Sequence, residues 1–62
     1  MESIAAEVKR LSSQAVQAKL NLHDLSEELP IHWEQIPAVA QRAFDLYREL
    51  ESKRAQLRAA GA

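Results

Sequence analysis

The sequence has no cysteine, one glycine and two prolines among its 62 residues, and these scarcities narrow the range of possible folds. Without cysteine there can be neither a disulfide nor a thiolate metal site, and its absence fits a reducing compartment. A domain of this size buries only about 60% of the surface that its unfolded chain exposes, so it usually needs a crosslink, a metal or a partner chain. We therefore expect self-association, or a metal held by histidine and carboxylates.

The sequence also lacks a charge excess and a long apolar run. The net charge is −1 and the pI is near 6.1, so no basic excess is available to hold nucleic acid. No apolar run reaches the roughly 18 residues of a membrane span, and the first residues do not form a basic and then apolar signal segment. We expect a cytoplasmic protein that does not contact membrane. Abundant Ala, Leu, Glu, Gln and Arg favour helix.

The first half of the chain carries two interleaved apolar series with a spacing of seven. The series are Ile4, Leu11, Ala18 and Leu25, and Met1, Val8, Ala15 and Leu22. Together they step by three and four residues, which is the a/d stripe of a heptad pattern and falls on one face of a helix. We predict a helix over about residues 3–29, with Ser3 as its N-cap and its end set by Pro30.

The second half repeats this pattern after a short connection over residues 30–36. Pro37 suits the first position of a helix, and we predict that helix over about residues 37–60, with Gly61 as its stop. Lys53 occupies a position where the stripe calls for an apolar residue. Its long aliphatic stem can lie over the seam while the ammonium group reaches water.

Two helices of similar length with a short connection predict an antiparallel hairpin, and the chain is expected to be a single domain over residues 1–62. One hairpin cannot cover both apolar stripes, so the predicted fold is all-α, with two hairpins forming a four-helix bundle. The two turns can lie at the same end of this homodimer or at opposite ends, and a higher oligomer is also open. The predicted dimer core consists of Ile4, Val8, Leu11, Ala15, Ala18, Leu22, Leu25, Ile36, Val39, Ala43, Leu46, Leu50 and Leu57.

One row of the first helix points away from this core and combines apolar with ligand-type residues. Val16 and Leu20 are followed on the same line by His23 and Glu27. Single apolar residues are common on protein surfaces, but this pair is also a candidate contact surface for a protein partner. Both interpretations of Val16 and Leu20 stay open.

The same row contains a candidate metal site. His23 and Glu27 are four residues apart, so an imidazole nitrogen and a carboxylate oxygen meet on the helix surface and can bind iron or another divalent transition metal. Asp24 is a further candidate ligand, although it projects about 100° away from His23. The alternative is a solvated imidazole that forms a hydrogen bond with Glu27. Two ligands from one chain leave the rest to water or to a second copy.

The remaining distinctive side chains favour packing. Trp33 is expected to fold over Leu25, Leu29 and Ile36 at the end of the bundle, and His32 to be a solvated residue of the connection. Phe44, Tyr47 and Ala40 are expected to widen the apolar face of the second helix. Pairing within that helix should neutralise much of its charge, which makes a base-stacking surface for RNA the least favoured function. The predicted pairs are Glu49 with Lys53, Asp45 with Arg48, and Glu51 with Arg54.

Catalysis is not indicated, because the sequence has no Gly-rich phosphate loop and no Ser, His and Asp set on a credible scaffold. A distinctive segment runs Gln17-Ala18-Lys19-Leu20-Asn21-Leu22-His23-Asp24-Leu25, and it is followed by Leu29-Pro30, Trp33-Glu34 and Ile36-Pro37. With Val39-Ala40-Gln41 and Tyr47-Arg48-Glu49-Leu50, it resembles the small Rop-like proteins encoded in nitrogen-fixation gene clusters, a family of unknown biochemical function. The resemblance covers roughly residues 8–57.

This resemblance implies a dimeric helical hairpin with a role in nitrogen fixation and a capacity to bind transition metal. It implies His23 as the favoured ligand, with Glu27 or Asp24 as its acidic companion. An acidic residue is expected two positions before the histidine, and this chain has Asn21 there. The hypothesis is therefore a non-enzymatic accessory protein of nitrogen fixation that binds metal and contacts a nitrogenase-maturation protein. The alternative is a metal-free adaptor that binds its partner through Val16 and Leu20.

Overall fold

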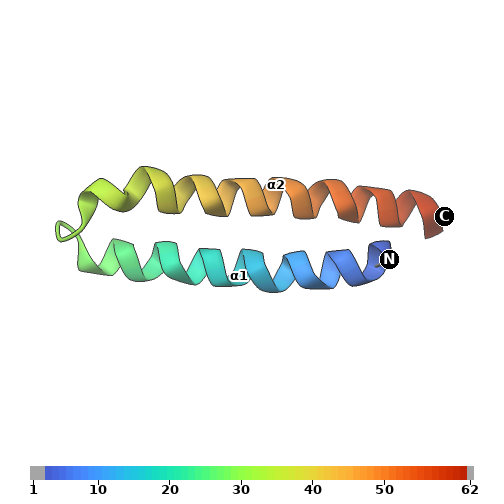
Figure 1. Cartoon of the computed structure of the whole chain (residues 1–62), viewed down its shortest axis with the longest axis horizontal. Coiled ribbons are helices and arrows are strands. Elements are labelled where there is room, and N and C mark those ends of the chain that lie inside the picture. Colours follow the sequence, from blue (N-terminus) through green and yellow to red (C-terminus); the bar gives the residue numbers. More distant parts are fainter. Residues whose placement is uncertain (1–2, 62) are drawn as a thin grey trace.

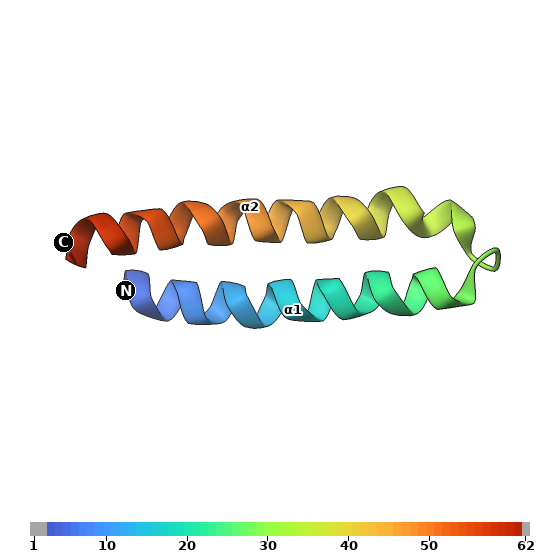
Figure 2. The ribbon, with the colours of Figure 1, turned by 180° about the vertical axis from the view of Figure 1, so that it is seen from behind.

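A computed structural model of the chain describes residues 3–61 as a hairpin of two long helices. Helix α1 spans Ile4–Glu28 and helix α2 spans Ile36–Gly61, with the short 3-10 helix η1 over Trp33–Gln35 between them. The helices lie side by side and antiparallel, with both ends of the chain at one end of a rod of 46 × 18 × 14 Å (Figures 1 and 2). Met1, which begins one predicted heptad series, lies outside the described residues.

Helix α1 begins and ends at the predicted signals. The Ser3 hydroxyl oxygen accepts a hydrogen bond from the Ala6 backbone N–H at 3.1 Å, which satisfies one of the unpaired donors of the first turn. At the other end, Leu29 has ψ of 142°, an extended value of the kind that a following proline favours. Capping at one end and proline at the other therefore set the length of this helix.

The connection is a tight turn rather than an open loop. The Ile31 N–H donates to the Glu28 carbonyl at 3.0 Å, and the Gln35 N–H donates to the His32 carbonyl at 3.0 Å. His32 has φ of 63° and ψ of 25°, in the left-handed region that histidine enters more readily than most residues. Helix α2 begins at Ile36, so Pro37 lies in the first turn, where a missing N–H breaks no helical hydrogen bond.

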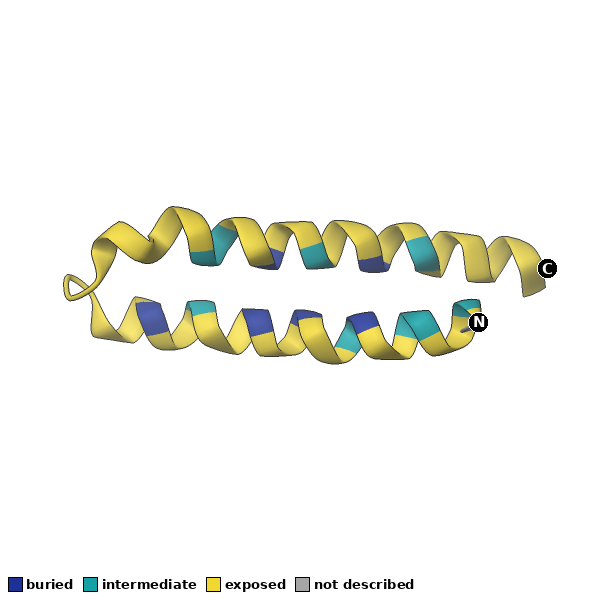
Figure 3. Ribbon diagram, in the orientation of Figure 1, coloured by how far each residue is buried: buried dark blue, intermediate teal, exposed yellow. Residues whose placement is uncertain are grey.

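The core is a narrow stripe along the facing sides of the two helices (Figure 3). Leu11, Ala15 and Leu50 form its centre, with Val8 and Leu46 packed against them. The small Ala15 is completely buried, which is what close approach of the two helices requires. Every buried residue belongs to the predicted core; the set is Leu11, Ala15, Ala18, Leu25, Ala43 and Leu50.

Other predicted core positions are less covered in the single chain. Ile36 and Leu57 are each more than one third exposed, because they lie at the two ends of the hairpin, where the facing helix stops. The prediction that Trp33 closes the end of the bundle over Leu25 and Leu29 is wrong for the single hairpin, since 64% of its surface is exposed. The left-handed residue and the short 3-10 helix leave the indole on the outside of the turn.

Lys53, the polar interruption of the second stripe, is accommodated by an ion pair between the helices. Its ammonium nitrogen lies 3.5 Å from a carboxylate oxygen of Glu7, and the two side chains are only 28% and 27% exposed. The predicted partner on its own helix was Glu49, whereas the structure pairs Lys53 across the hairpin. This contact joins the two helices near the end that carries the chain termini.

The hairpin exposes more surface than its mass warrants. Its accessible surface is 4719 Å², whereas a compact monomer of 7.0 kDa exposes about 4,000 Å² by the usual scaling. A two-helix rod has no third element to cover its flanks, which explains the excess. Among the described residues, neither helix combines the length and the apolar character that a membrane span needs.

Candidate functional site

The outward row of α1 is arranged as its spacing predicts. Val16 and Leu20 lie opposite the buried stripe and are 44% and 47% exposed. One helical turn further on, the His23 Nε2 atom lies 3.4 Å from a carboxylate oxygen of Glu27. The Ser26 hydroxyl donates to the His23 carbonyl at 2.6 Å, within the same turn. Apolar and ligand-type side chains therefore form one continuous exposed row.

The two carboxylates near His23 approach different ring nitrogens. Glu27 lies beside Nε2, whereas an Asp24 oxygen lies 3.8 Å from Nδ1. The two nitrogens point away from each other across the imidazole ring, so one ion bound at Nε2 can reach Glu27 but not Asp24. In this arrangement Asp24 is suited to hold the ring orientation rather than to bind the same ion.

The His23 row does not by itself form a closed metal centre. All three side chains are about two-thirds to three-quarters exposed, so water has free access to them. Over residues 3–61, no group of three or more histidine, cysteine or acidic side chains is placed to hold a metal. His32 lies in the turn and does not join His23 in such a group.

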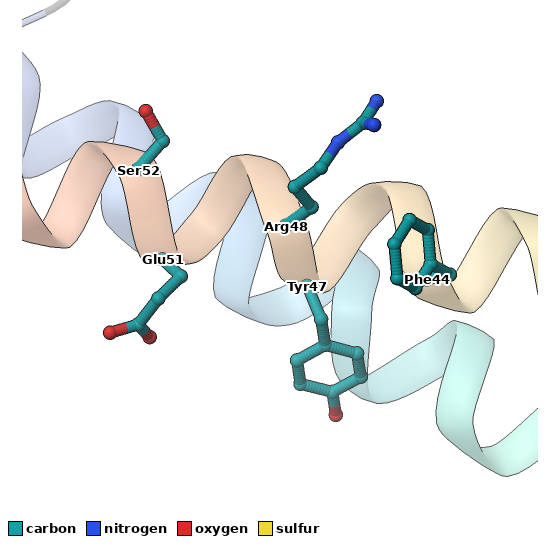
Figure 4. Close-up of a pocket in the computed structure, with 5 residues that line it drawn as sticks. All are labelled: Phe44, Tyr47, Arg48, Glu51 and Ser52. Atoms are coloured by element: carbon teal, nitrogen blue, oxygen red, sulfur yellow. The ribbon is translucent and has the colours of Figure 1, made fainter.

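A second feature is the aromatic flank, which we define as Phe44 and Tyr47 of α2. The two side chains are 59% and 40% exposed and line a shallow depression with Arg48, Glu51 and Ser52. Figure 4 shows Tyr47 and Glu51 on one side of α2 and Arg48 and Ser52 on the other. The Arg48 guanidinium carbon lies 5.6 Å from the centre of the Phe44 ring, in the range of a cation–π contact.

The aromatic flank does not widen the core of the single chain as predicted, because Phe44 projects about 100° away from Ala43 on the helix. Tyr47, in contrast, is close enough to the seam to be partly covered. By helix geometry, the α1 flank on the same face of the hairpin carries the partly buried Val8 and Ser12. The opposite face is polar, with Gln14, Gln17 and Asn21 on α1 and Arg42 and Glu49 on α2.

Ion pairs neutralise part of the charge of α2, although with partners that differ from two of the predicted ones. Asp45 pairs with Arg48 at 3.7 Å, as its spacing predicts. Glu51 pairs with Arg58 at 3.7 Å instead of Arg54. Along α2, acidic and basic side chains therefore remain interleaved, and no continuous basic stripe of the kind that nucleic acid needs is formed there.

Comparison with known proteins assigns the fold to a family. A family model described as Rop-like matches residues 1–62, the whole chain. The chain belongs to the Rop-like family. Membership agrees with the two-helix hairpin and with the resemblance carried by the Leu22-His23-Asp24-Leu25 segment and the two Leu-Pro and Ile-Pro steps. No solved structure matches this Rop-like chain.

Three relatives illustrate what the chain is similar to. A UPF0437 protein of Azorhizobium caulinodans is 47% identical over 58 residues, which cover 94% of this chain and 84% of the relative. UPF0437 protein y4xE of Sinorhizobium fredii is 41% identical and covers 95% of this chain and 88% of its own length. A Frankia alni protein is 49% identical over 43 residues, which cover 69% of this chain and 52% of the relative. Its name places it in the nifX-nifW intergenic region.

Sequence reasoning found the His23 row but missed the one-sidedness of the hairpin. The heptad spacing shows which residues face the other helix, but it does not show which flank of each helix lies on the same side. The signal was present in the off-stripe positions, where Phe44 and Tyr47 stand on one flank of α2 and Arg42 and Glu49 on the other. Reading it requires the handedness and the antiparallel pairing of both helices.

Proposed function

We propose that this chain is a non-enzymatic accessory protein of nitrogen fixation that works as a homodimeric four-helix bundle. The observation that carries the dimer is the exposed aromatic flank on one face of the hairpin, where Phe44 and Tyr47 are 59% and 40% exposed. The hairpin exposes about 700 Å² more surface than a compact monomer of its mass, and this excess is close to the roughly 800 Å² that each partner buries in a standard interface. The name of the Frankia relative supports the nitrogen-fixation role.

The dimer is tested by the mass in solution and by one substitution on each face. Wild type should elute with twice the 7.0 kDa of the chain. Phe44→Asp puts a charge into the aromatic flank, and loss of a buried aromatic contact of about 2 kcal/mol or more weakens association at least 30-fold. Arg42→Asp on the polar face is the matched control and should leave the mass unchanged. A monomeric wild type at high micromolar concentration contradicts the proposal.

The biological role is tested by deletion of the gene in its host. Growth on fixed nitrogen should be normal, while growth on dinitrogen as the sole nitrogen source should be slowed. Complementation with wild type should restore growth on dinitrogen, and complementation with Phe44→Asp should not if the dimer is the active form. Equal growth of the deletion strain and wild type on dinitrogen would contradict a role in nitrogen fixation.

We further propose that His23 and Glu27 bind iron or another divalent transition metal, with Asp24 as their acidic neighbour. The 3.4 Å distance between His23 Nε2 and the Glu27 carboxylate supports this proposal, because the two ligand atoms lie close together and both side chains are exposed. Water or a second molecule supplies the remaining ligands. The proposal predicts saturable binding of Fe²⁺ in anaerobic calorimetry that is abolished by His23→Ala.

The three side chains have separable roles in this metal site. Glu27→Gln removes the charge of a metal ligand and should weaken Fe²⁺ binding strongly. Asp24→Asn changes only the support of the imidazole ring, so it should weaken Fe²⁺ binding less, by about 10-fold. His32→Ala is the matched control, because it removes the second histidine of the chain, which does not belong to the row. Binding that persists in His23→Ala, with helicity unchanged by circular dichroism, would refute the assignment.

The second candidate function is a metal-free adaptor that binds a protein, for example one of nitrogenase maturation, through Val16 and Leu20. The supporting observation is that both side chains are nearly half exposed on the face of α1 that points away from α2. Val16→Asp should abolish capture of that partner from nitrogen-fixing cells and leave Fe²⁺ binding intact. Loss of both together, or of neither, would contradict the adaptor.

A further inference from the structure

The turn of the hairpin exposes apolar side chains that neither the core nor the turn itself requires. Ile31 and Trp33 are 63% and 64% exposed, the highest values among the large apolar side chains of residues 3–61. Leu29 and Ile36, on either side of them in the chain, are 40% and 38% exposed. Tight turns ordinarily carry Gly, Pro, Asn, Asp or Ser, each of which helps the chain to reverse. Isoleucine and tryptophan have no such role. We call these four residues the turn cluster.

The turn cluster stands on a well-defined backbone at the narrow end of the rod (Figure 1). Every residue from 26 to 38 is exposed (Figure 3). The Ile31 N–H donates to the Glu28 carbonyl at 3.0 Å, and the Trp33 N–H donates to the Pro30 carbonyl at 3.3 Å. A partner that binds here does not have to order a loop, so association loses little conformational entropy.

The charge around the turn cluster has one sign. No lysine or arginine occurs between Lys19 and Arg42. The acidic residues of this stretch, which give it a charge of −4 with histidine neutral, are Asp24, Glu27, Glu28 and Glu34. The rest of the chain holds all eight basic and five acidic residues, a charge of +3. Within the described part of the chain, Glu28 and Glu34 take part in no ion pair, so their charges are available to a partner.

We infer that the turn cluster is a docking surface for a protein that offers an apolar pocket with a basic rim. The end of a rod is convex and fits a concave surface, and tryptophan is a typical anchor of such an interface. The surrounding carboxylates attract lysine and arginine at the rim and repel acidic surfaces. The same charge disfavours the anionic surface of a membrane.

This docking surface is separate from the features used above. Phe44 lies eight residues, about 12 Å of helix, beyond Ile36, and Val16 and Leu20 lie on the first helix before its last two turns. The inference therefore goes beyond the proposed function and depends neither on the dimer nor on the metal site. Failure of the tests below would leave both of those proposals in place.

The partner can be captured with a photoreactive amino acid. Benzoylphenylalanine replaces Ile31 in the full chain, which is expressed in nitrogen-fixing cells. The expected product is a covalent adduct with a protein whose linked residues lie in an apolar pocket bordered by lysine or arginine. The same replacement at Gln14, on the polar face, is the matched control and should not give this adduct. An adduct with lipid, with a second copy or with an acidic surface overturns the inference, as does no adduct beyond that of the control.

Trp33 reports on the turn cluster directly, because it is the only tryptophan of the chain. The free protein should show the emission of a water-exposed indole, unchanged by concentration and by vesicles of phosphatidylcholine or phosphatidylglycerol. The purified cross-linked protein should shift this emission to shorter wavelength. A shift with vesicles assigns the turn cluster to a membrane, and a shift on concentrating the chain alone assigns it to a second copy. Either result overturns the inference.

The apolar part of the contact is measured by titration of the cross-linked protein with variants. Trp33→Ala should weaken binding by about 30-fold or more, as expected for an aromatic anchor. Leu57→Ala, which removes another exposed apolar side chain at the far end of the hairpin, is the matched control and should bind as wild type does. Unchanged affinity of Trp33→Ala, with helicity retained in circular dichroism, overturns the inference.

The charged part of the contact is measured by the dependence of binding on salt. Glu28→Gln with Glu34→Gln should weaken binding by about tenfold at low salt, and the difference from wild type should shrink in about 1 M salt. Asp45→Asn with Glu49→Gln removes the same number of carboxylates from the middle of α2 and is the matched control. Equal effects of the two double variants at low salt overturn the basic rim.

Discussion

The ion pair between Lys53 and Glu7 gives the sharpest prediction about stability, because it lies where the heptad pattern calls for an apolar residue. Its atoms are 3.5 Å apart and its side chains are nearly three-quarters buried. At this distance the Coulomb energy is about 1 kcal/mol in water and about 4–5 kcal/mol at an effective dielectric constant of 20, before desolvation is subtracted. A net coupling of about 1 kcal/mol lies between the usual surface pair and a buried one.

A double-mutant cycle of Glu7→Gln and Lys53→Met measures this coupling from urea unfolding at a fixed protein concentration. We expect the losses in free energy of unfolding of the two single variants to add up to about 1 kcal/mol more than the loss in the double variant. A difference of this size corresponds to about 4–8 °C in melting temperature. The exposed pair of Asp45 and Arg48 is the control, with an expected coupling of about 0.3–0.5 kcal/mol. Equal coupling energies for the two pairs would refute the reasoning.

The same site predicts the effect of removing both charges in favour of apolar side chains. Glu7→Leu with Lys53→Leu completes the apolar stripe, and replacement of a largely buried ion pair by hydrophobic residues is often neutral or stabilising by 1–4 kcal/mol. We expect the double variant to unfold at a urea concentration at least as high as wild type. A lower midpoint would mean that the pair contributes more than the apolar contacts that replace it.

Two further changes test the core and the helix start. Leu50→Ala removes a side chain that is 2% exposed and packed against Leu11 and Ala15, and it should lower the free energy of unfolding by about 2–5 kcal/mol. A small core supplies only about 3–5 kcal/mol, so cooperative melting in circular dichroism should be lost. A free energy of unfolding within about 0.5 kcal/mol of wild type would contradict the assignment of the core. Ser3→Ala removes the hydroxyl that caps α1 and should cost about 1 kcal/mol, measured as a lower melting temperature, whereas Ser13→Ala, on an exposed position within the same helix, should not lower it.

The candidate site could be foreseen only in part. The spacing of His23 and Glu27 was sufficient to predict that they meet, because residues four apart on a helix are always neighbours. That Asp24 approaches the other ring nitrogen depends on the rotamer of the imidazole, which no spacing determines. The exposure of Trp33 likewise depends on how the chain turns at His32, and the pattern alone suggested a packed indole.

The sequence by itself determined the two helices, both ends of α1 and the buried faces. The predicted stop of the second helix at Gly61 is wrong, since α2 includes Gly61. Heptad spacing, a serine cap and the prolines act locally, within one or two turns of helix, so they can be read without coordinates. The tertiary structure alone decided that Lys53 pairs with Glu7 across the seam and that the aromatic flank stands on the same side of the hairpin as Val8 and Ser12. Both depend on the register and relative rotation of two helices, which are set by contacts between residues more than 30 positions apart in the chain.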